Sequence, residues 1–470
     1  MIFNSIEFLL FALVFFAGWP LLKKQKDLRW LFITFMSFVF YGWWDWRFLL
    51  LIIGSGLIDY IAAILIRQTP AYRKLILIVS LAGNLGSLFI FKYSVFFANL
   101  FEDVFATAGF DIDLVSRIPE FALILPVGIS FYTFQSMSYA FDIYRRQLEP
   151  VKDIVPFMTF VAFFPHMVAG PIQRASFFLP QFLTRKQFSY DLAAKGLKIM
   201  LFGFFMKVAI ADRLALYVDA IYKNVDMHTG WSYLMATFFF AFQIYGDFAG
   251  YSLIAIGCAL LFGFHMSPNF NRPYFSASFR EFWSRWHMSL STWFKDYLYI
   301  PLGGNKGSKA RTYFNLFTTF LVSGLWHGAN WTFVVWGALH GGYQIAERTI
   351  NNRVKIKLPK AVSIVLVFAL TCLAWVFFRA ATVQDAFHIV GTIFTNLGDT
   401  VHIGDIGIFA FSIVGILMLL TIEMFMEYYP DTTLINHRRA PVRYATMVAM
   451  LAWIITLGVF DGSQFIYFQF

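Results

Sequence analysis

Two histidines in apolar surroundings are the residues of this sequence best placed to do chemistry. His327 lies within Ser323–Trp331, where small residues on both sides leave room for a second backbone or a ligand. His287 lies within Phe282–Trp293, where aromatic and polar residues are interleaved. A buried imidazole is uncharged near neutral pH and can take a proton from a hydroxyl group, as a general base does. The alternative for each is a packed core histidine hydrogen-bonded to a backbone carbonyl.

The sequence patterns of several other chemistries are missing. Cys258 and Cys372 are far apart in apolar runs, and no histidine spacing typical of a metal site occurs, so we expect no metal. No nucleophile elbow or phosphate-binding glycine loop occurs, and Gly303–Gly307 is better interpreted as a turn. Base chemistry without a metal or a covalent serine indicates transfer from an activated donor such as a thioester.

Other polar and aromatic residues could support the two histidines. Asn330 follows His327 by three residues and would share its face of a continuous helix, where it could orient the imidazole. His340, 13 residues after His327, would lie on the opposite face. Asp247 is an intramembrane carboxylate that we expect to pair with a basic side chain or a backbone donor. A further set of aromatic residues could shape a passage and exclude water: Trp283, Trp286 and Trp326.

The composition indicates that these residues sit in a membrane protein. Of 470 residues, 59% are hydrophobic, only 14% are charged and 60 are Phe. That apolar surface exceeds what one water-soluble core could bury, so the excess must face lipid. A soluble enzyme, a disordered regulator and a disulfide scaffold are excluded. The apolar runs are continuous and not alternating, which argues against a transmembrane barrel.

Apolar runs of spanning length recur along the whole chain, without a repeat or a linker. They predict about eleven transmembrane helices in a single membrane domain, 1–470. The runs are 5–22, 30–44, 48–66, 75–98, 120–142, 154–170, 192–211, 231–262, 313–340, 361–378, 405–427 and 444–460. The proline-flanked run 154–170 predicts a re-entrant helix. Run 313–340 has basic loops on both sides, so it is either a re-entrant hairpin or a steep helix.

The basic residues follow the pattern of membrane topology. Of the 37 Lys and Arg, 30 lie in alternate loops, which we assign to the inside of the membrane. The first apolar run is followed, not preceded, by Lys23, Lys24 and Lys26, which predicts an N-terminus outside. The net charge of +10 therefore reflects topology, and we expect no nucleic-acid partner.

Several motifs in order along most of the chain resemble the membrane-bound O-acyltransferase family, in its bacterial polysaccharide branch. They are Phe163–Ile172, Gln243–Ser252, Phe270–Tyr274, Phe282–Phe294, Tyr299–Asn305, Gly324–Asn330 and Phe465–Phe470. The resemblance implies an all-α polytopic membrane protein with re-entrant or interfacial helices around a central tunnel. It implies that His327, in the Leu-Trp-His-Gly motif, is catalytic, and that His287 is the second active-site position. We expect the tunnel to be lined by Trp283, Trp286, Trp326, Asn330, Asp247 and Tyr299.

The same resemblance implies the substrates. A thioester such as acetyl-CoA or an acyl carrier would enter from the cytoplasmic side, with the basic segment 272–311 lining the donor side and no bound cofactor. The acyl group would leave to a hydroxyl of an extracytoplasmic polysaccharide, or of a partner acetyltransferase of the SGNH type. The protein would lie in the bacterial cytoplasmic (inner) membrane.

Two positions depart from the pattern of the alginate relatives. Ala249 replaces the Ser of the Asp-Phe-Ser-Gly-Tyr-Ser motif, and Leu253 stands where a second Asp is usual. The resemblance therefore does not identify alginate as the polymer. A polytopic transporter or a scaffold subunit of a polysaccharide export complex is the alternative. The small number of intramembrane acids argues against a transporter, and the two histidines argue against a scaffold.

Overall fold

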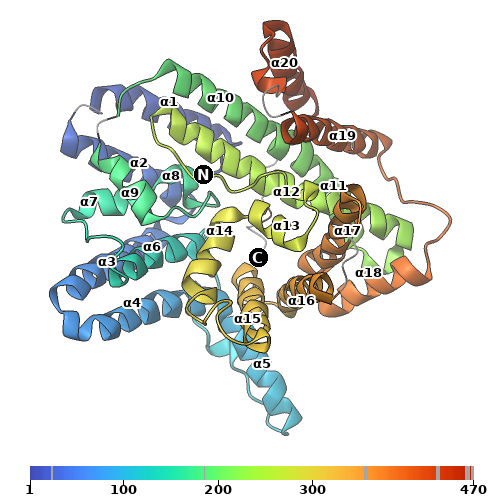
Figure 1. The fold of residues 1–470 in the computed structure, drawn as a ribbon, viewed down its shortest axis with the longest axis horizontal. Helices are drawn as coiled ribbons and strands as arrows, with labels where there is room; N and C mark the ends of the chain where they lie inside the picture. The colour runs from blue at the N-terminus through green and yellow to red at the C-terminus, as the bar shows by residue number, and fades with distance from the viewer. Residues whose placement is uncertain (23–24, 185, 354–357, 430–433, 461–465, 467–470) are drawn as a thin grey trace. The chain divides into compact units, whose positions relative to one another are not determined.

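A computed structural model describes residues 1–470 except 23–24, 185, 354–357, 430–433, 461–465 and 467–470 (Figure 1). The described residues form helices and loops and contain no strand, which confirms the all-α prediction. The chain groups into two compact units, Met1–Ser189 with Phe262–Ser267, and Tyr190–Leu261 with Pro268–Phe470. Of the residues named above, Lys23, Lys24 and most of Phe465–Phe470 lie outside the described residues.

The first unit contains a series of apolar helices around an aromatic interior. They are α1 (Ile6–Leu22), α2 (Lys26–Asp45), α3 (Leu49–Gln68), α4 (Arg73–Leu88), α5 (Ser94–Thr107), α6 (Ile129–Tyr144), α7 (Ile154–Val161), α8 (Phe164–Met167) and α9 (Ala175–Leu183). The rings of Phe163, Phe164 and Phe262 pack together there, with centroids 5.6–6.1 Å apart. None of the candidate site residues belongs to this unit.

The second unit carries all the candidate site residues. Its helices are α10 (Tyr190–Phe204), α11 (Asp212–Tyr222), α12 (Gly230–Leu261), α13 (Phe279–Arg285), α14 (Met288–Phe294), α15 (Lys309–His327), α16 (Trp331–Arg353), α17 (Lys360–Arg379), α18 (Val383–Thr395), α19 (Ile406–Tyr428) and α20 (Ala440–Leu457). Two π-helical turns continue such helices, η6 (Phe205–Ala211) after α10 and η9 (Lys295–Tyr299) after α14.

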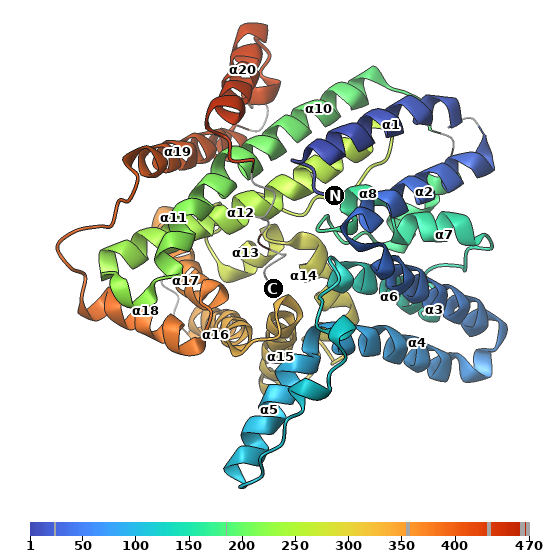
Figure 2. The same cartoon turned by 180° about the vertical axis from the view of Figure 1, so that it is seen from behind.

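Helices α10 and α12 run side by side in both views of the ribbon (Figures 1 and 2). Glycines let them approach closely. A Cβ atom on Gly203 would clash with the carbonyl oxygen of Gly250, and one on Gly250 would clash with that of Gly203. Small residues at such a contact allow backbone-to-backbone packing, which is how apolar helices associate where no hydrophobic drive operates between them.

Six helical segments among the described residues are long and apolar enough to cross a membrane, and α1 is apolar but shorter. The six are Leu28–Gln68, Pro70–Thr107, Gly230–Leu261, Lys360–Arg379, Ile406–Tyr428 and Ala440–Leu457. This confirms a multi-pass membrane protein. It does not confirm the count of eleven, partly because Leu28–Gln68 contains two of the predicted runs, 30–44 and 48–66.

Three predicted segments differ in detail from the observed helices. The predicted run 120–142 begins with a short 3-10 helix (Glu120–Ala122) and becomes α-helical only at Ile129, after Gly128 in the left-handed region (φ 75°). The run 154–170 forms α7 and α8, two short buried helices in place of one, and its re-entrance into the membrane stays a prediction. The run 313–340 is not one helix, because α15 ends at His327 and α16 begins at Trp331. The two helices pack against each other as a helical hairpin, and its re-entrance into the membrane stays a prediction.

Candidate active site

His327 is the last residue of α15 and its side chain is only 4% exposed. The glycines on both sides of it serve close packing with α16. A Cβ on Gly324 would clash with the carbonyl oxygen of Phe333, and one on Gly328 would clash with the Phe333 ring. Gly324 thus admits the backbone of α16 and Gly328 admits the Phe333 ring, so the space at both positions is filled by α16 and not by a ligand.

His287 is fully buried and has a strained backbone. It precedes α14 with φ 42°, in the left-handed region that a non-glycine residue rarely adopts. Such a conformation costs about 1–3 kcal/mol and persists only where the surroundings impose it. They do so through two backbone hydrogen bonds, from Asn271 N to Arg285 O (2.9 Å) and from Met288 N to Asn269 O (2.8 Å). We call the paired segments 269–272 and 285–289 the His287 clasp.

Asn269 fixes the protonation pattern of His287. Its Oδ1 accepts hydrogen bonds from Ser289 N (3.2 Å) and Ser289 Oγ (2.8 Å), which identifies this atom as the amide oxygen. The same oxygen lies 3.1 Å from His287 Nδ1, so Nδ1 carries the proton and donates it. In the neutral ring Nε2 is then the acceptor. The amide nitrogen donates to Ser252 Oγ at 3.2 Å.

The structure brings the two histidines together. Their ring centroids are 6.3 Å apart, and the Trp326 ring lies 6.0 Å from His287 and 5.0 Å from His327. Trp336 and Phe378 complete the shell around His327, at 5.0 and 5.4 Å. Water is poorly retained among such rings, so a proton transfer here would take place in a medium of low dielectric.

A cavity of about 750 Å³ reaches residues adjacent to both histidines. Ser323, one helical turn before His327, lines it, and so does Met288, which follows His287. The rings of Trp283 and Tyr299 form part of the wall of this cavity. Neither histidine ring itself lines this cavity.

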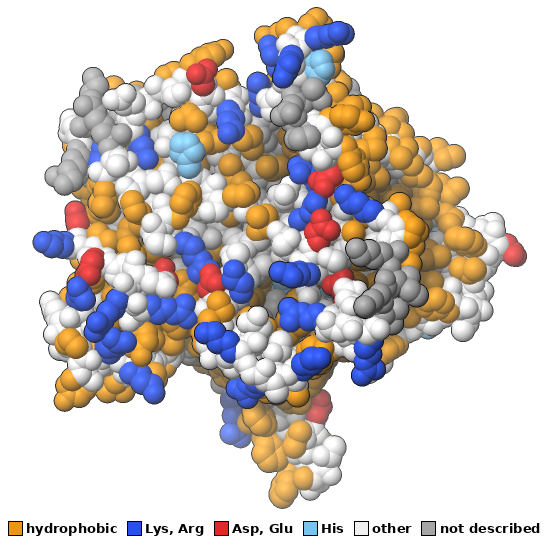
Figure 3. Space-filling view, in the orientation of Figure 1, with side chains coloured by type: hydrophobic (Ala, Val, Ile, Leu, Met, Phe, Trp, Pro, Cys, Tyr) orange, Lys and Arg blue, Asp and Glu red, His pale blue; other side chains and the backbone are white. Residues whose placement is uncertain are grey.

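Basic side chains lie along the outer part of this cavity. They are Arg280, Lys295 and Arg348. A second cavity of about 480 Å³ shares Arg280, Asn305, Gln344 and Arg348 with the first and adds Lys309. Figure 3 shows several basic side chains, with acidic ones among them, over the part of the second unit that carries α15 and α16. The two adjoining cavities therefore combine an aromatic interior with a positively charged rim.

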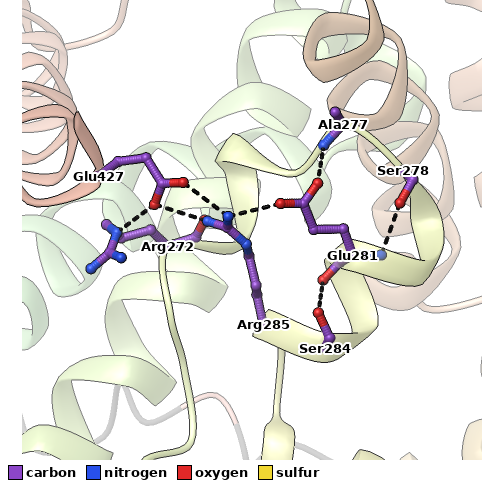
Figure 4. Close-up of polar contacts among 7 residues, drawn as sticks. All are labelled: Arg272, Ala277, Ser278, Glu281, Ser284, Arg285 and Glu427. Atoms are coloured by element: carbon purple, nitrogen blue, oxygen red, sulfur yellow. Dashed lines mark hydrogen bonds and ion pairs between the residues drawn. The ribbon is translucent and has the colours of Figure 1, made fainter. Parts of the chain in front are cut away.

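A network of ion pairs holds the clasp from outside (Figure 4). Glu427, at the end of α19, accepts from Arg272 Nε at 2.8 Å and from both terminal nitrogens of Arg285 at 2.9 Å. Arg285 also pairs with Glu281 at 2.7 Å. These hydrogen bonds raise the pKa of the Arg285 guanidinium further, because they stabilise its charged form. One carboxylate thus ties both segments of the clasp to α19.

Comparisons with known proteins agree with this site. The family model described as MBOAT, membrane-bound O-acyltransferase family, matches residues 145–383. The probable alginate O-acetylase AlgI of Pseudomonas aeruginosa is 40% identical over 400 residues, covering 84% of this chain and 75% of that protein. The chain belongs to the membrane-bound O-acyltransferase family. It is an acyltransferase, and the resemblance inferred from the motifs is confirmed.

Two further relatives of this O-acyltransferase are named for different activities. The peptidoglycan O-acetyltransferase of Helicobacter pylori is 35% identical over 428 residues, covering 83% of this chain and 79% of the relative. The teichoic acid D-alanyltransferase of Bacillus subtilis is 28% identical over 232 residues, covering 47% of this chain and 58% of the relative. The segment that matches the family model contains both histidines.

The tryptophans of the O-acyltransferase separate into two groups. Trp326 packs on both histidines, and Trp283 lines the cavity and lies 5.0 Å from His340. Trp286 does not line the cavity. It is 1% exposed and packs 5.0 Å from Trp375, within the hydrophobic core of the second unit. The geometry favours a packing role for Trp286, because it touches neither histidine ring nor the cavity in these contacts.

The expected alignment of Asn330 with His327 is wrong. Because α15 ends at His327, the two residues do not share a helical face. The Asn330 amide is used locally, donating to Ala381 O at 3.0 Å and accepting from Thr332 N at 3.1 Å. The prediction for His340 fails for the same reason, since His340 belongs to α16. Its ring packs 4.9 Å from Trp336, in the same aromatic shell.

Asp247 pairs with a basic side chain, as expected of a buried carboxylate. Its Oδ1 lies 2.6 Å from Lys207 Nζ, and its Oδ2 accepts from Ile466 N at 2.7 Å. Lys207 also contacts Asp212 at 2.5 Å. These contacts place Asp247 in an ion-pair network and leave its predicted tunnel role without support.

Three residues with a clear structural role were not predicted from the sequence: Asn269, Glu427 and Lys207. A signal existed for Lys207, because it is the one charged residue in the apolar stretch 199–211, where a charge requires a partner. Asn269 directly precedes the Phe270–Tyr274 motif. Its role follows only from the fold of the clasp, and the same is true of Glu427, 142 residues from Arg285.

Proposed function

We propose that this O-acyltransferase carries an acetyl group across the membrane, from a thioester donor on the side of the basic loops to a hydroxyl on the other side. The donor is acetyl-CoA or an acyl carrier, and the acceptor is a polysaccharide or a serine of an SGNH-type partner. The membrane is the bacterial cytoplasmic membrane, with the N-terminus outside. The observation that carries the proposal is the buried pair His287 and His327, 6.3 Å apart and adjoining the large cavity.

In the proposed reaction His327 is the general base. Its imidazole takes the proton of the acceptor hydroxyl while the oxygen attacks the thioester carbonyl carbon. The tetrahedral intermediate collapses with cleavage of the carbon–sulfur bond, and the leaving thiolate takes the proton back from the imidazolium. The products are an ester and a free thiol, and His327 ends neutral. The aromatic shell supports this role, because excluding water limits hydrolysis of the donor.

The hydrogen bond to Asn269 restricts what His287 can do. With Nδ1 donating to Asn269, a neutral His287 offers only an acceptor at Nε2. This nitrogen can accept a hydrogen bond from the hydroxyl of the acceptor substrate or from an N–H group of the thioester substrate. It cannot polarise the thioester carbonyl, because that role needs a group that donates a hydrogen bond. A role for His287 in binding a substrate is therefore favoured over polarising the carbonyl.

The cations around the cavity support a phosphate-bearing donor. Arg280, Lys295 and Arg348 line it, and thioesters of CoA or of a phosphopantetheine carrier bring negative charge to its entrance. The aromatic wall would then receive the acyl-bearing end. Two of these cations, Arg280 and Lys295, belong to segment 272–311, which the sequence assigns to the side where the thioester enters.

Thiol release from a defined donor tests the proposed function. Purified protein in detergent is incubated with acetyl-CoA or with an acetylated acyl carrier protein, with and without polysaccharide or SGNH-type acceptor, and free thiol is measured. We expect release from at least one thioester, with labelled acetyl recovered as an ester when a suitable acceptor is present. Failure of both thioesters to bind or to lose acetyl would contradict the proposal.

Asn269→Leu should slow transfer by about 10²-fold, because losing the shared acceptor frees the His287 ring from its aligned position. Asn269 is a positioning residue here, so kcat should fall while KM for the donor changes little. Asn269→Asp keeps the acceptor oxygen and should recover part of the rate. Equal kcat for the Leu variant and the unaltered protein would show that the clasp does not serve catalysis.

A further inference from the structure

A separate cavity of about 260 Å³ lies on the other side of the His287 clasp. Its walls belong to the second unit: one face each of α10, α12 and α19, closed by the loop 268–272 and by Ile435 and Asn436. The proposed acyl transfer does not use this space. Its lining is mostly apolar, but its entrance is basic.

The α10 wall changes from charged to apolar along one helical face. Lys195, Lys198, Ile199 and Phe202 line the cavity at positions i, i+3, i+4 and i+7, and Met206 continues the line into η6. From the first lysine to Phe202 the helix rises about 10 Å. The two lysines lie at the more exposed end, and Lys198 Nζ contacts Asn436 Oδ1 at 3.3 Å. A ligand matching this wall would have an anionic head and an apolar tail.

The α12 wall is mostly apolar. Ala249, Leu253 and Ile256 line this cavity on one face of α12, together with Ser252. The first three side chains are a methyl, an isobutyl and a sec-butyl group, so this wall suits a hydrocarbon chain.

The third wall carries a carboxylate that is already engaged. Glu423 of α19 is 3% exposed and accepts a hydrogen bond from Tyr245 OH. This contact directs the carboxylate toward Tyr245, and among the described residues Glu423 forms no ion pair with Lys195 or Lys198. Arg272 adds a further cation to the lining, although Glu427 holds its Nε.

We propose that this cavity binds one anionic phospholipid, with its phosphate against Lys195 and Lys198 and an acyl chain between α10 and α12. The lipid is drawn from the leaflet next to the basic loops, where anionic headgroups and basic side chains attract each other. Because Asn269 both lines the cavity and holds His287, the acyl chain packs against the back of the clasp. The proposal is independent of the acyl-transfer function.

Lipid retention tests the proposal without any activity measurement. The protein is purified from nanodiscs of phosphatidylcholine containing phosphatidylglycerol, and bound lipid is counted by native mass spectrometry. We expect one retained phosphatidylglycerol and no retained phosphatidylcholine. Lys195→Gln with Lys198→Gln should weaken phosphatidylglycerol binding by about 30-fold, the product of two lost phosphate contacts. Ala249→Phe should abolish retention by filling the chain site.

A matched control removes two basic side chains elsewhere. Lys74→Gln with Lys152→Gln takes the same charge from exposed positions of the first unit and should leave retention unchanged. Three outcomes would each overturn the proposal. The protein could retain both lipids equally, the two double variants could lose the lipid equally, or excess inorganic phosphate alone could displace it. Melting curves of all variants identify any that fail to fold. If one fails, the unaltered protein still tests the site, because a photoactivatable phosphatidylglycerol should label Phe202 or Ile256.

Discussion

His327→Ala is expected to reduce acyl transfer by about 10²–10⁴-fold while the protein still binds its donor. The expectation follows from the role of general base, since the acceptor hydroxyl would lose its only assigned proton acceptor. Thiol release in the presence of acceptor measures kcat, and equilibrium binding of a non-hydrolysable thioester analogue measures donor affinity. Binding should change far less than kcat, because donor contacts are assigned to the cavity and not to this ring.

His340→Ala provides a matched control in the same aromatic shell. Trp336 packs 5.0 Å from His327 and 4.9 Å from His340, so either deletion removes a buried imidazole from the same neighbour. If loss of packing explained the effect, both variants would lose activity alike. We expect His340→Ala to keep most of its rate per folded molecule. Full activity of the His327 variant would overturn its assignment as the base.

Local sequence patterns predicted the membrane class and many of the helices. The run 231–262 and α12 (Gly230–Leu261) agree closely, because a long apolar helix leaves little ambiguity. The break after His327 was harder to locate, since run 313–340 remains apolar across it. Phe333 packs against Gly324 and Gly328 across this break, a tertiary contact that the apolar pattern does not encode.

The sequence pointed to the two histidines of the candidate site but not to the contacts around them. His287 and His327 stood out as histidines in apolar segments, and the structure brings them together. The left-handed backbone of His287 has no signature in residue type, because a glycine or asparagine would be usual there. The contact with Asn269 joins two segments of a loop whose path depends on tertiary structure. Periodicity therefore could not predict the tautomer of His287 or the role of that amide.

Lys207→Met is expected to lower the free energy of unfolding by about 3–5 kcal/mol, the largest stability effect we anticipate. Lys207 is 5% exposed and is the shared cation for Asp212 and Asp247, so its loss would leave two buried carboxylates without their cation. The midpoint temperature of thermal unfolding of this variant, measured in nanodiscs, should lie below that of the unaltered protein. Lys223→Met is the control. The side chain of Lys223 is 74% exposed and its Nζ lies as far as 3.9 Å from Asp219 Oδ2, and exposed pairs of this kind contribute at most about 1 kcal/mol.

A triple variant separates lost charge balance from lost packing. Lys207→Met combined with Asp212→Asn and Asp247→Asn removes the cation and both anions, and the new amide at position 247 would still offer an oxygen to Ile466 N. Replacing a whole buried ion network by neutral groups is often nearly neutral, whereas breaking it is not. We therefore expect the triple variant to melt well above Lys207→Met alone. If the two melted together, the loss would come from the shape of the lysine and its π-helical turn, and the charge argument would be wrong.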